Sequence, residues 1–165
     1  MTQHPATVPE EQLKAKCTVR FQRRSGPGGQ HRNKVETAVV LTHEIEGIEA
    51  SASERRSQAE NLKVALRRMR LNLALNYRTE WTTSSPTWQS RCRKGRLAVN
   101  PAHEDFPGLL AEALDALAVH AWDVPPTAEA LACSSSQLTR FIKNEPRAFQ
   151  MLNNQRQQSG RKPLQ

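Results

Sequence analysis

Three stretches in the first third of the chain alternate between apolar and polar positions in the manner of β-strands. Residues 17–22 (Cys-Thr-Val-Arg-Phe-Gln) alternate from one position to the next, and residues 37–43 (Thr-Ala-Val-Val-Leu-Thr-His) are rich in β-branched and apolar side chains. Residues 48–52 follow Gly47, which lies where a hairpin turn would reverse the chain. The pattern therefore predicts a small sheet of three strands.

From Glu54 to about Leu75 the period changes to that of a helix. Ser51 or Ser53 is expected to cap its first turn, and Ser51 with Glu54 has the spacing of a capping box. Such a helix would cover the small sheet, so the predicted fold class is α+β. Apolar residues recur on one face at three- and four-residue steps, namely Leu62, Ala65, Leu66, Met69 and Leu73.

The extreme N-terminus shows no pattern that predicts burial. Residues 1–12 contain Pro5 and Pro9 among polar residues, so we expect a flexible arm, with order beginning near Leu13. The predicted α+β domain then occupies residues 13–76.

The second half of the chain predicts a connection followed by helices. Residues 77–107 carry no sustained period and include several arginines, which favours a basic, irregular linker. Residues 108–158 return to helical spacing and predict an all-helical C-terminal domain. Residues 159–165 are expected to form a tail.

Composition narrows the class of partner. The 165 residues carry a formal net charge of +8 and a pI of about 10.0, which favours a polyanionic partner such as nucleic acid or an anionic membrane. A solvated basic surface explains the charge equally well. The N-terminal residues lack an export signal, and no stretch approaches the roughly 20 apolar residues that cross a bilayer. Cys17, Cys92 and Cys133 are far apart in sequence, so reduced thiols in a cytoplasmic protein are expected, without a zinc site.

A glycine-rich segment joins the first two predicted strands. It reads Ser25-Gly26-Pro27-Gly28-Gly29-Gln30, and one explanation is an ordinary turn, because glycine and proline are frequent in turns. Its neighbourhood contains no Ser/His/Asp set, no paired carboxylates and no cluster of metal ligands.

The residues around this segment carry a family resemblance. The run of residues 24–38 (Arg-Ser-Gly-Pro-Gly-Gly-Gln-His-Arg-Asn-Lys-Val-Glu-Thr-Ala) looks like the Gly-Gly-Gln (GGQ) signature of class I peptide chain release factors and codon-independent peptidyl-tRNA hydrolases. The similarity continues through Thr42-His43, Gly47-Ile48 and residues 54–58 in the same order, and it spans roughly residues 15–75. The chain thus resembles the catalytic domain of that family.

This resemblance implies an enzyme whose loop enters the peptidyl transferase centre of the large ribosomal subunit. Gly28, Gly29 and Gln30 would be the catalytic residues, and water would attack the ester that joins the nascent peptide to tRNA. Glycines allow a close approach of the backbone to RNA. The backbone N–H of Gln30 would act as an oxyanion-hole donor, while its side chain shapes the water pocket. His31 is expected to contact RNA rather than to act as a general base, and no cofactor or metal is implied.

The implied partners are rRNA of the large subunit and peptidyl-tRNA. A methyltransferase that acts on Gln30 is a further candidate partner, which the sequence leaves open. Basic residues would contact rRNA phosphates in a salt-dependent manner, although a solvated surface also explains any single helix arginine. The residues assigned to rRNA binding are Arg24, Ser25, His31, Arg32, Asn33, Lys34, Arg55, Arg56 and Gln58.

The C-terminal half departs from the family pattern. No motif of a stop-codon reader is visible, and the basic tail of codon-independent rescue hydrolases is also missing. Residues 128–142 instead resemble a helix-turn-helix whose second helix, residues 136–144, would present Gln137, Arg140 and Lys143 to a nucleic acid. A small structural bundle explains the same residues.

Three functional hypotheses follow. The first is codon-independent hydrolysis of peptidyl-tRNA for ribosome rescue, with the C-terminal helices docking on RNA. The second is a non-catalytic DNA-binding regulator that uses the helix-turn-helix. The third is an RNA-binding protein that kept the fold without the activity, and the intact Gly28-Gly29-Gln30 argues against it.

Overall fold

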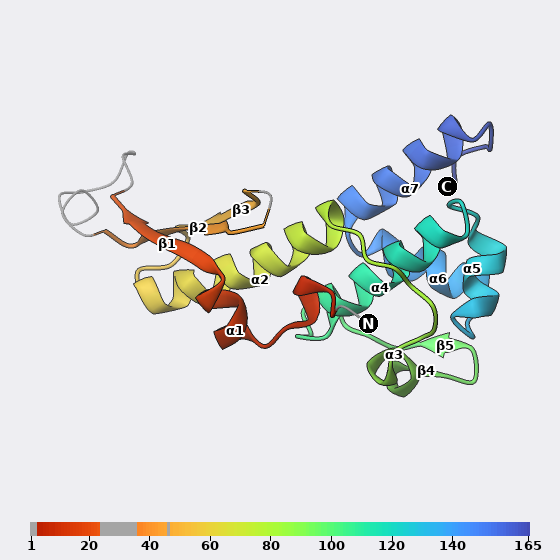
Figure 1. The fold of residues 1–165 in the computed structure, drawn as a ribbon, viewed down its shortest axis with the longest axis horizontal. Coiled ribbons are helices and arrows are strands. Elements are labelled where there is room, and N and C mark those ends of the chain that lie inside the picture. The colour runs from red at the N-terminus through yellow and green to blue at the C-terminus, as the bar shows by residue number, and fades with distance from the viewer. Residues whose placement is uncertain (1–2, 24–35, 46) are drawn as a thin grey trace.

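The computed structural model describes residues 3–23, 36–45 and 47–165. They form a small antiparallel sheet, a long helix packed on one of its faces, and a group of helices at the other end of that helix (Figure 1). This arrangement agrees with the predicted α+β class.

The sheet contains three strands in the order β1-β2-β3, all antiparallel. Val19 pairs with Leu41, and Leu41 pairs with Ala50. In β2 the residues Val39, Leu41 and His43 are buried, while the alternate positions are half-buried, as expected when one face of a sheet is covered. The three predicted strands are confirmed within one residue at each start: β1 is Cys17–Gln22, β2 is Ala38–His43 and β3 is Glu49–Ala52.

Helix α2, Gln58–Asn76, covers the sheet and contacts β2 and β3. It begins four residues later than predicted, because the chain remains extended through β3 and then bends. The cap is Ser57, whose hydroxyl accepts a hydrogen bond from the backbone N–H of Glu60 at 3.5 Å. The predicted caps Ser51 and Ser53 are therefore wrong. Of the predicted apolar face, Leu62 is half-buried, and the other four are buried: Ala65, Leu66, Met69 and Leu73.

The N-terminal segment is packed, so the predicted arm over residues 1–12 is wrong within the described residues. A 3-10 helix, η1 (Pro5–Thr7), precedes helix α1 (Glu10–Ala15). Ala6 and Val8 are buried, and the Arg70 Nε donates to the carbonyl of Ala6 at 2.9 Å. The two prolines stand at helix starts, where a missing N–H costs nothing.

The connection between the two halves is also more regular than predicted. It contains helix α3 (Pro86–Arg91) and a two-stranded hairpin of β4 (Cys92–Arg93) and β5 (Arg96–Leu97). Trp88 is 1% exposed, and its indole N–H donates to the carbonyl of Leu131 at 2.8 Å. The irregular linker of the prediction is thus anchored to the helices that follow.

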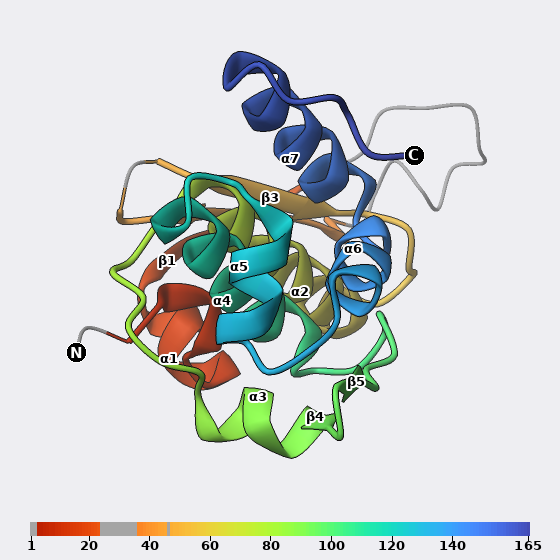
Figure 2. The ribbon, with the colours of Figure 1, turned by 90° about the vertical axis from the view of Figure 1, so that its right-hand side faces the viewer.

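Four helices make up the second half. They are α4 (Phe106–Val119), α5 (Val124–Ala130), α6 (Ser135–Lys143) and α7 (Pro146–Gln158). Helix α4 is buried along most of its length and contacts α2, α5 and α6. Figure 2 shows α7 at the outer edge of this group, with residues 159–165 folded back beside it.

The two halves share one hydrophobic core. Buried residues of the sheet, α2, the N-terminal segment and α4 belong to a single cluster. A salt bridge also joins the two halves. Arg78 pairs with the carboxylate of Asp115 at 2.9 Å, and the Asp115 side chain is 3% exposed. Among the described residues, no helix combines the length and apolar character needed to cross a membrane.

Candidate functional site

The candidate site is the segment that joins β1 to β2. All of its motif residues lie in residues 24–35, outside the described residues. The structure instead describes the frame that holds this segment at both ends. The sequence-predicted residues that lie outside the description are Gly28, Gly29, Gln30, Arg24, Ser25, His31, Arg32, Asn33 and Lys34.

The two stems of the segment are held together by the hairpin itself. Gln22 and Ala38 form the last strand pair. One residue further out on the β1 side, Arg23 pairs with Glu36, with 3.5 Å between the guanidinium Nε and the carboxylate Oε1. Both of these side chains are at least half exposed, so the ion pair contributes little to stability. It does show that the two ends of the segment leave the sheet side by side.

Asn61 fixes the C-terminal stem to α2. Its side-chain amide donates to the carbonyl of Thr37 at 2.7 Å and to the carbonyl of Arg55 at 3.0 Å, and its side-chain oxygen accepts from the Arg55 N–H at 2.9 Å. The residue is fully buried, so these bonds satisfy groups that water does not reach. Residues 37 and 55 are consequently neighbours.

Sequence reasoning missed Asn61, although a signal was present. Asn61 lies four residues before Ala65, on the same apolar stripe that continues through Met69 and Leu73. A polar residue in the buried stripe of a helix needs hydrogen-bond partners. Its carboxamide could thus have been expected to hold backbone from another segment.

Gln58, predicted to bind rRNA, has a structural contact. Its side-chain amide donates to the carbonyl of Glu36 from the first position of α2. Arg55 and Arg56, also predicted to bind rRNA, are exposed just before the helix. Because Asn61 joins residue 55 to residue 37, the structure brings both arginines to the base of the segment.

The bend between β3 and α2 is braced by Arg68. Its guanidinium donates to the carbonyl of Ser51 at 2.7 Å and forms an ion pair with Glu54, which also accepts from the Ser53 N–H at 2.8 Å. The hydrogen bond from Arg68, with that backbone N–H, lowers the pKa of Glu54 from 4.5 to about 2. Glu54 is therefore held as a carboxylate by Arg68.

The other predicted nucleic-acid residues lie elsewhere. Helix α6 begins and ends one residue earlier than predicted, and α5 and α6 pack together across residues 131–134. Arg140 and Lys143 are exposed, whereas Gln137 is half-buried. Figure 1 places α6 at the opposite end of the molecule from the three-stranded sheet, so the structure does not bring these three residues to the stems of the candidate site.

Comparison with known proteins gives matches to release factors. Residues 7–100 match the RF-1 domain family. The chain is 44% identical over 66 residues to the chloroplastic peptide chain release factor PrfB1 of Arabidopsis thaliana. It is 44% identical over 59 residues to peptide chain release factor 1 of Symbiobacterium thermophilum, and 40% identical over 76 residues to an uncharacterised mitochondrial release-factor-like protein of Saccharomyces cerevisiae.

These similarities cover part of each chain. They take in 40%, 36% and 46% of the present chain, and 14%, 17% and 48% of the respective relatives. The chain thus spans less than half of the length of each of these curated relatives. The matched family region runs from the last residue of η1 through α1, the sheet and α2 to the β4–β5 hairpin, so it contains both stems of the segment.

Proposed function

The chain belongs to the RF-1 domain family, the catalytic domain family of class I peptide chain release factors, and from this premise we propose that it is a peptidyl-tRNA hydrolase acting in the ribosomal peptidyl transferase centre. The observation that carries the proposal is the family match over residues 7–100, which includes Gly28-Gly29-Gln30 and both stems that hold that segment. The family match shows that the chain is release-factor-like. Hydrolysis of peptidyl-tRNA by this chain is what we propose.

The proposed chemistry uses the backbone. Water attacks the ester carbonyl of peptidyl-tRNA, the bond to the terminal ribose oxygen breaks, and the Gln30 N–H stabilises the charge that develops. Gly28 and Gly29 allow the chain to approach RNA where a Cβ would interfere. A hydrogen-bond donor acts best when it is preorganised. Asn61 and Gln58 support this mechanism, because they fix the C-terminal stem of the segment at Thr37 and Glu36.

The proposed partners are rRNA of the large subunit and peptidyl-tRNA, in the cytoplasm. Arg55 and Arg56 stand exposed at the base of the segment, where they would contact phosphates. The same role is proposed for the basic residues within residues 24–35. Modification of Gln30 by a methyltransferase is a further element of the proposal.

We propose that hydrolysis is independent of the codon in the A site, as ribosome rescue requires. Outside the family match, residues 101–165 form α4–α7 and pack on α2. The test compares peptide release from purified ribosome complexes that present a stop codon, a sense codon or an empty A site. Similar rates are expected. Release confined to UAA, UAG and UGA would contradict codon independence and leave the hydrolase proposal intact.

The test of the chemistry pairs two substitutions in the same segment. Gly29→Val places a branched Cβ where the backbone must meet RNA, so single-turnover release at saturating protein should fall by at least about 10²–10³, the usual effect of losing one oxyanion donor. His31→Ala should be far milder. Thermal unfolding of both variants checks that the fold is kept.

The opposite pattern would overturn the mechanism. If Gly29→Val released peptide at the wild-type rate while His31→Ala was inactive, the backbone would not supply the chemistry, and His31 would become the candidate base. If the wild-type protein released no peptide from any ribosome complex, the hydrolase proposal itself would fail.

A further inference from the structure

Two surface hollows contain several basic residues, and they differ in charge balance. The first lies between the outer face of the sheet, α2 and the start of α7. Each of its three arginines already has a carboxylate: Arg20 pairs with Glu49, Arg68 with Glu54 and Arg147 with Glu145. This hollow has no surplus of positive charge for an anion.

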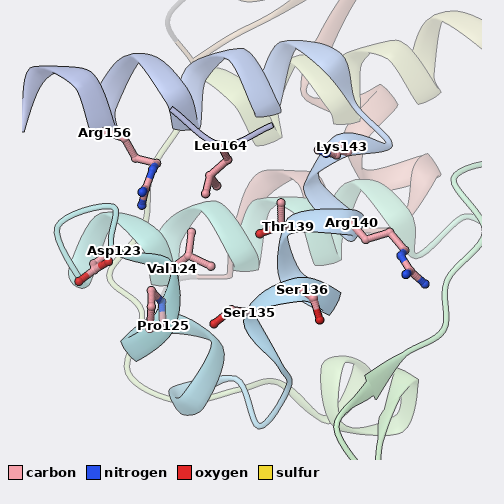
Figure 3. A pocket seen from close by; sticks show the side chains of 10 residues that line it. All are labelled: Asp123, Val124, Pro125, Ser135, Ser136, Thr139, Arg140, Lys143, Arg156 and Leu164. Atoms are coloured by element: carbon pink, nitrogen blue, oxygen red, sulfur yellow. The ribbon is translucent and has the colours of Figure 1, made fainter. Parts of the chain in front are cut away.

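The second hollow lies between α5, α6 and α7 and has a volume of about 520 Å³ (Figure 3). The outward face of α6 forms its floor, while residues of α5, α7 and the segment after α7 rise around it. Its lining comprises Asp123, Val124, Pro125, Ser135, Ser136, Thr139, Arg140, Lys143, Arg156 and Leu164.

The charge of this hollow is unbalanced. Arg140, Lys143 and Arg156 are cationic, and within the described part of the chain none of them forms an ion pair with an acidic side chain. The one acidic residue of the lining, Asp123, lies 3.9 Å from the guanidinium of Arg161. The hollow therefore keeps a net positive charge that favours an anionic ligand.

Two of the cations are held in place by neighbouring groups. Lys143 lies over the Phe149 ring, 5.1 Å from its centroid, and donates to the main-chain oxygen of Gln165. The Arg156 Nε donates to the carbonyl of Lys162 at 3.2 Å. The two terminal nitrogens of this guanidinium have no hydrogen-bond partner among the described residues. The Arg140 side chain is exposed and has no hydrogen-bond partner among the described residues. A guanidinium group that is held in place, as that of Arg156 is, suits phosphate oxygens.

Hydroxyl groups stand between the cations. Ser135 and Thr139 face the hollow from α6, and neither hydroxyl has a hydrogen-bond partner among the described residues. Ser136 is exposed beside them and lies 3.0 Å from the Ser134 hydroxyl. Hydroxyls together with arginine and lysine are the groups that contact phosphate and sugar in nucleic acids.

The concave shape distinguishes between forms of nucleic acid. A helix that reads duplex DNA must enter a major groove about 12 Å wide, so it has to stand out from its neighbours. Here the outward face of α6 forms the floor of a hollow between α5 and α7. A single strand can bend into such a surface and follow a basic groove.

We propose that the hollow between α5, α6 and α7 is a second RNA-binding site, which takes the sugar-phosphate backbone of a single strand through Arg140, Arg156 and the hydroxyls of α6. Gln137, predicted from the helix-turn-helix pattern, does not line it. That the RNA is ribosomal rests on the proposed function, whereas binding of the strand does not.

The experiment measures the affinity of the full chain for a fluorescein-labelled uridine oligonucleotide of about twelve nucleotides, a length typical of single-strand sites, at several salt concentrations. Each phosphate contact on a single strand contributes about 0.7 to the slope of log affinity against log salt. Arg140→Ala with Arg156→Ala should therefore lower the slope by about 1.4. Ser135→Glu should weaken binding by repulsion without removing any described contact.

The matched control removes two arginines outside the hollow. Arg93 and Arg96 are exposed in the β4–β5 hairpin, and Arg93→Ala with Arg96→Ala causes the same loss of net charge. This control should leave the slope close to the wild-type value.

Three results would overturn the proposal. The first is an equal loss of slope in the control and in the Arg140/Arg156 variant, because the net charge alone would then explain binding. The second is wild-type binding by both the Arg140/Arg156 variant and Ser135→Glu. The third is a preference of the wild type for duplex DNA over the single strand that disappears in the Arg140/Arg156 variant, which would make the helices a DNA-binding motif.

Discussion

Asn61 is the residue on which the geometry of the loop stem depends. Asn61→Ala removes three hydrogen bonds to buried or half-buried backbone. Loss of such bonds, with partners left unsatisfied, should lower the free energy of unfolding by about 2–4 kcal/mol, as measured by urea denaturation. Peptide release should fall as well, because the Thr37 stem loses its attachment to α2.

Asn76→Ala on the same helix is the control. Asn76 is exposed, and among the described residues its side-chain amide donates to the carbonyl of Asn72 alone, at 2.8 Å. The change in stability should therefore stay within about 0.5 kcal/mol. Equal stability of the Asn61 and Asn76 variants would contradict the clamp described for Asn61.

Glu54 offers a test by titration. Its folded pKa of about 2 lies below the ordinary 4.5, chiefly because of the hydrogen bond from Arg68. The stabilisation from this pair is therefore present above pH 4.5 and is lost as pH falls through about 2. Carboxyl chemical shifts in NMR should show Glu54 titrating near its lowered value in the wild type. In Arg68→Gln the titration should return toward the ordinary value, and an unchanged curve would remove Arg68 as the cause.

At the residue scale, the sequence indicated the motif of the segment and missed the residues that support its stems. Gly28, Gly29 and Gln30 are recognisable because they are consecutive and lie between two strands. The contacts of Asn61 reach residue 37, 24 positions away in the chain, and no local pattern reveals such a pairing. The contacts of Arg68 with Ser51 and Glu54 likewise depend on where β3 ends.

The α3–β4–β5 segment is an element whose position depends on one side chain. Trp88 is almost fully buried, with its ring 5.8 Å from that of Phe141 in an edge-on arrangement. Trp88→Ala should lower the free energy of unfolding by about 3–5 kcal/mol, as expected for a large aromatic residue removed from a core. Chemical denaturation monitored by circular dichroism would measure it.

Trp88→Phe separates packing from hydrogen bonding. It keeps an aromatic ring but loses the N–H that donates to the Leu131 carbonyl, so a smaller loss of about 1–3 kcal/mol is expected from the unsatisfied acceptor. Equal losses for the two variants would mean that the ring contributes no packing energy.

Elements with a regular period were predictable, and those fixed by distant contacts were not. The strands and α2 follow from alternation and from the three- and four-residue steps. The N-terminal helices do not, since Ala6 and Val8 are buried only because α2 and α4 lie against them. The same holds for Trp88, whose partners come 43 and 53 positions later.

At the scale of the whole molecule, α2 belongs to both halves. It contacts β2 and β3 along with α4 and η1. A chain that ends at residue 104 would lack α4, whose Leu110 and Leu114 are fully buried, and would uncover the apolar surface of α2 and η1 that α4 contacts. We therefore expect this fragment to lose cooperative thermal unfolding.

The control for that truncation ends at residue 158 and removes only the segment after α7. It should keep a cooperative transition, because α4 and the shared core remain. A cooperative transition in the shorter fragment would show that the α+β half folds alone, as a separate domain over residues 13–76 would.

The length of helix α2 determines how far the stem of the segment moves when the helix tilts. Its 19 residues make a rod about 28 Å long, with the stem of the segment at one end and the helical half near the other (Figure 1). Over that length, a tilt of about one degree displaces the far end by about 0.5 Å, the precision that catalytic groups need. A small change in the angle between α2 and the helical half would therefore displace the stem of the segment.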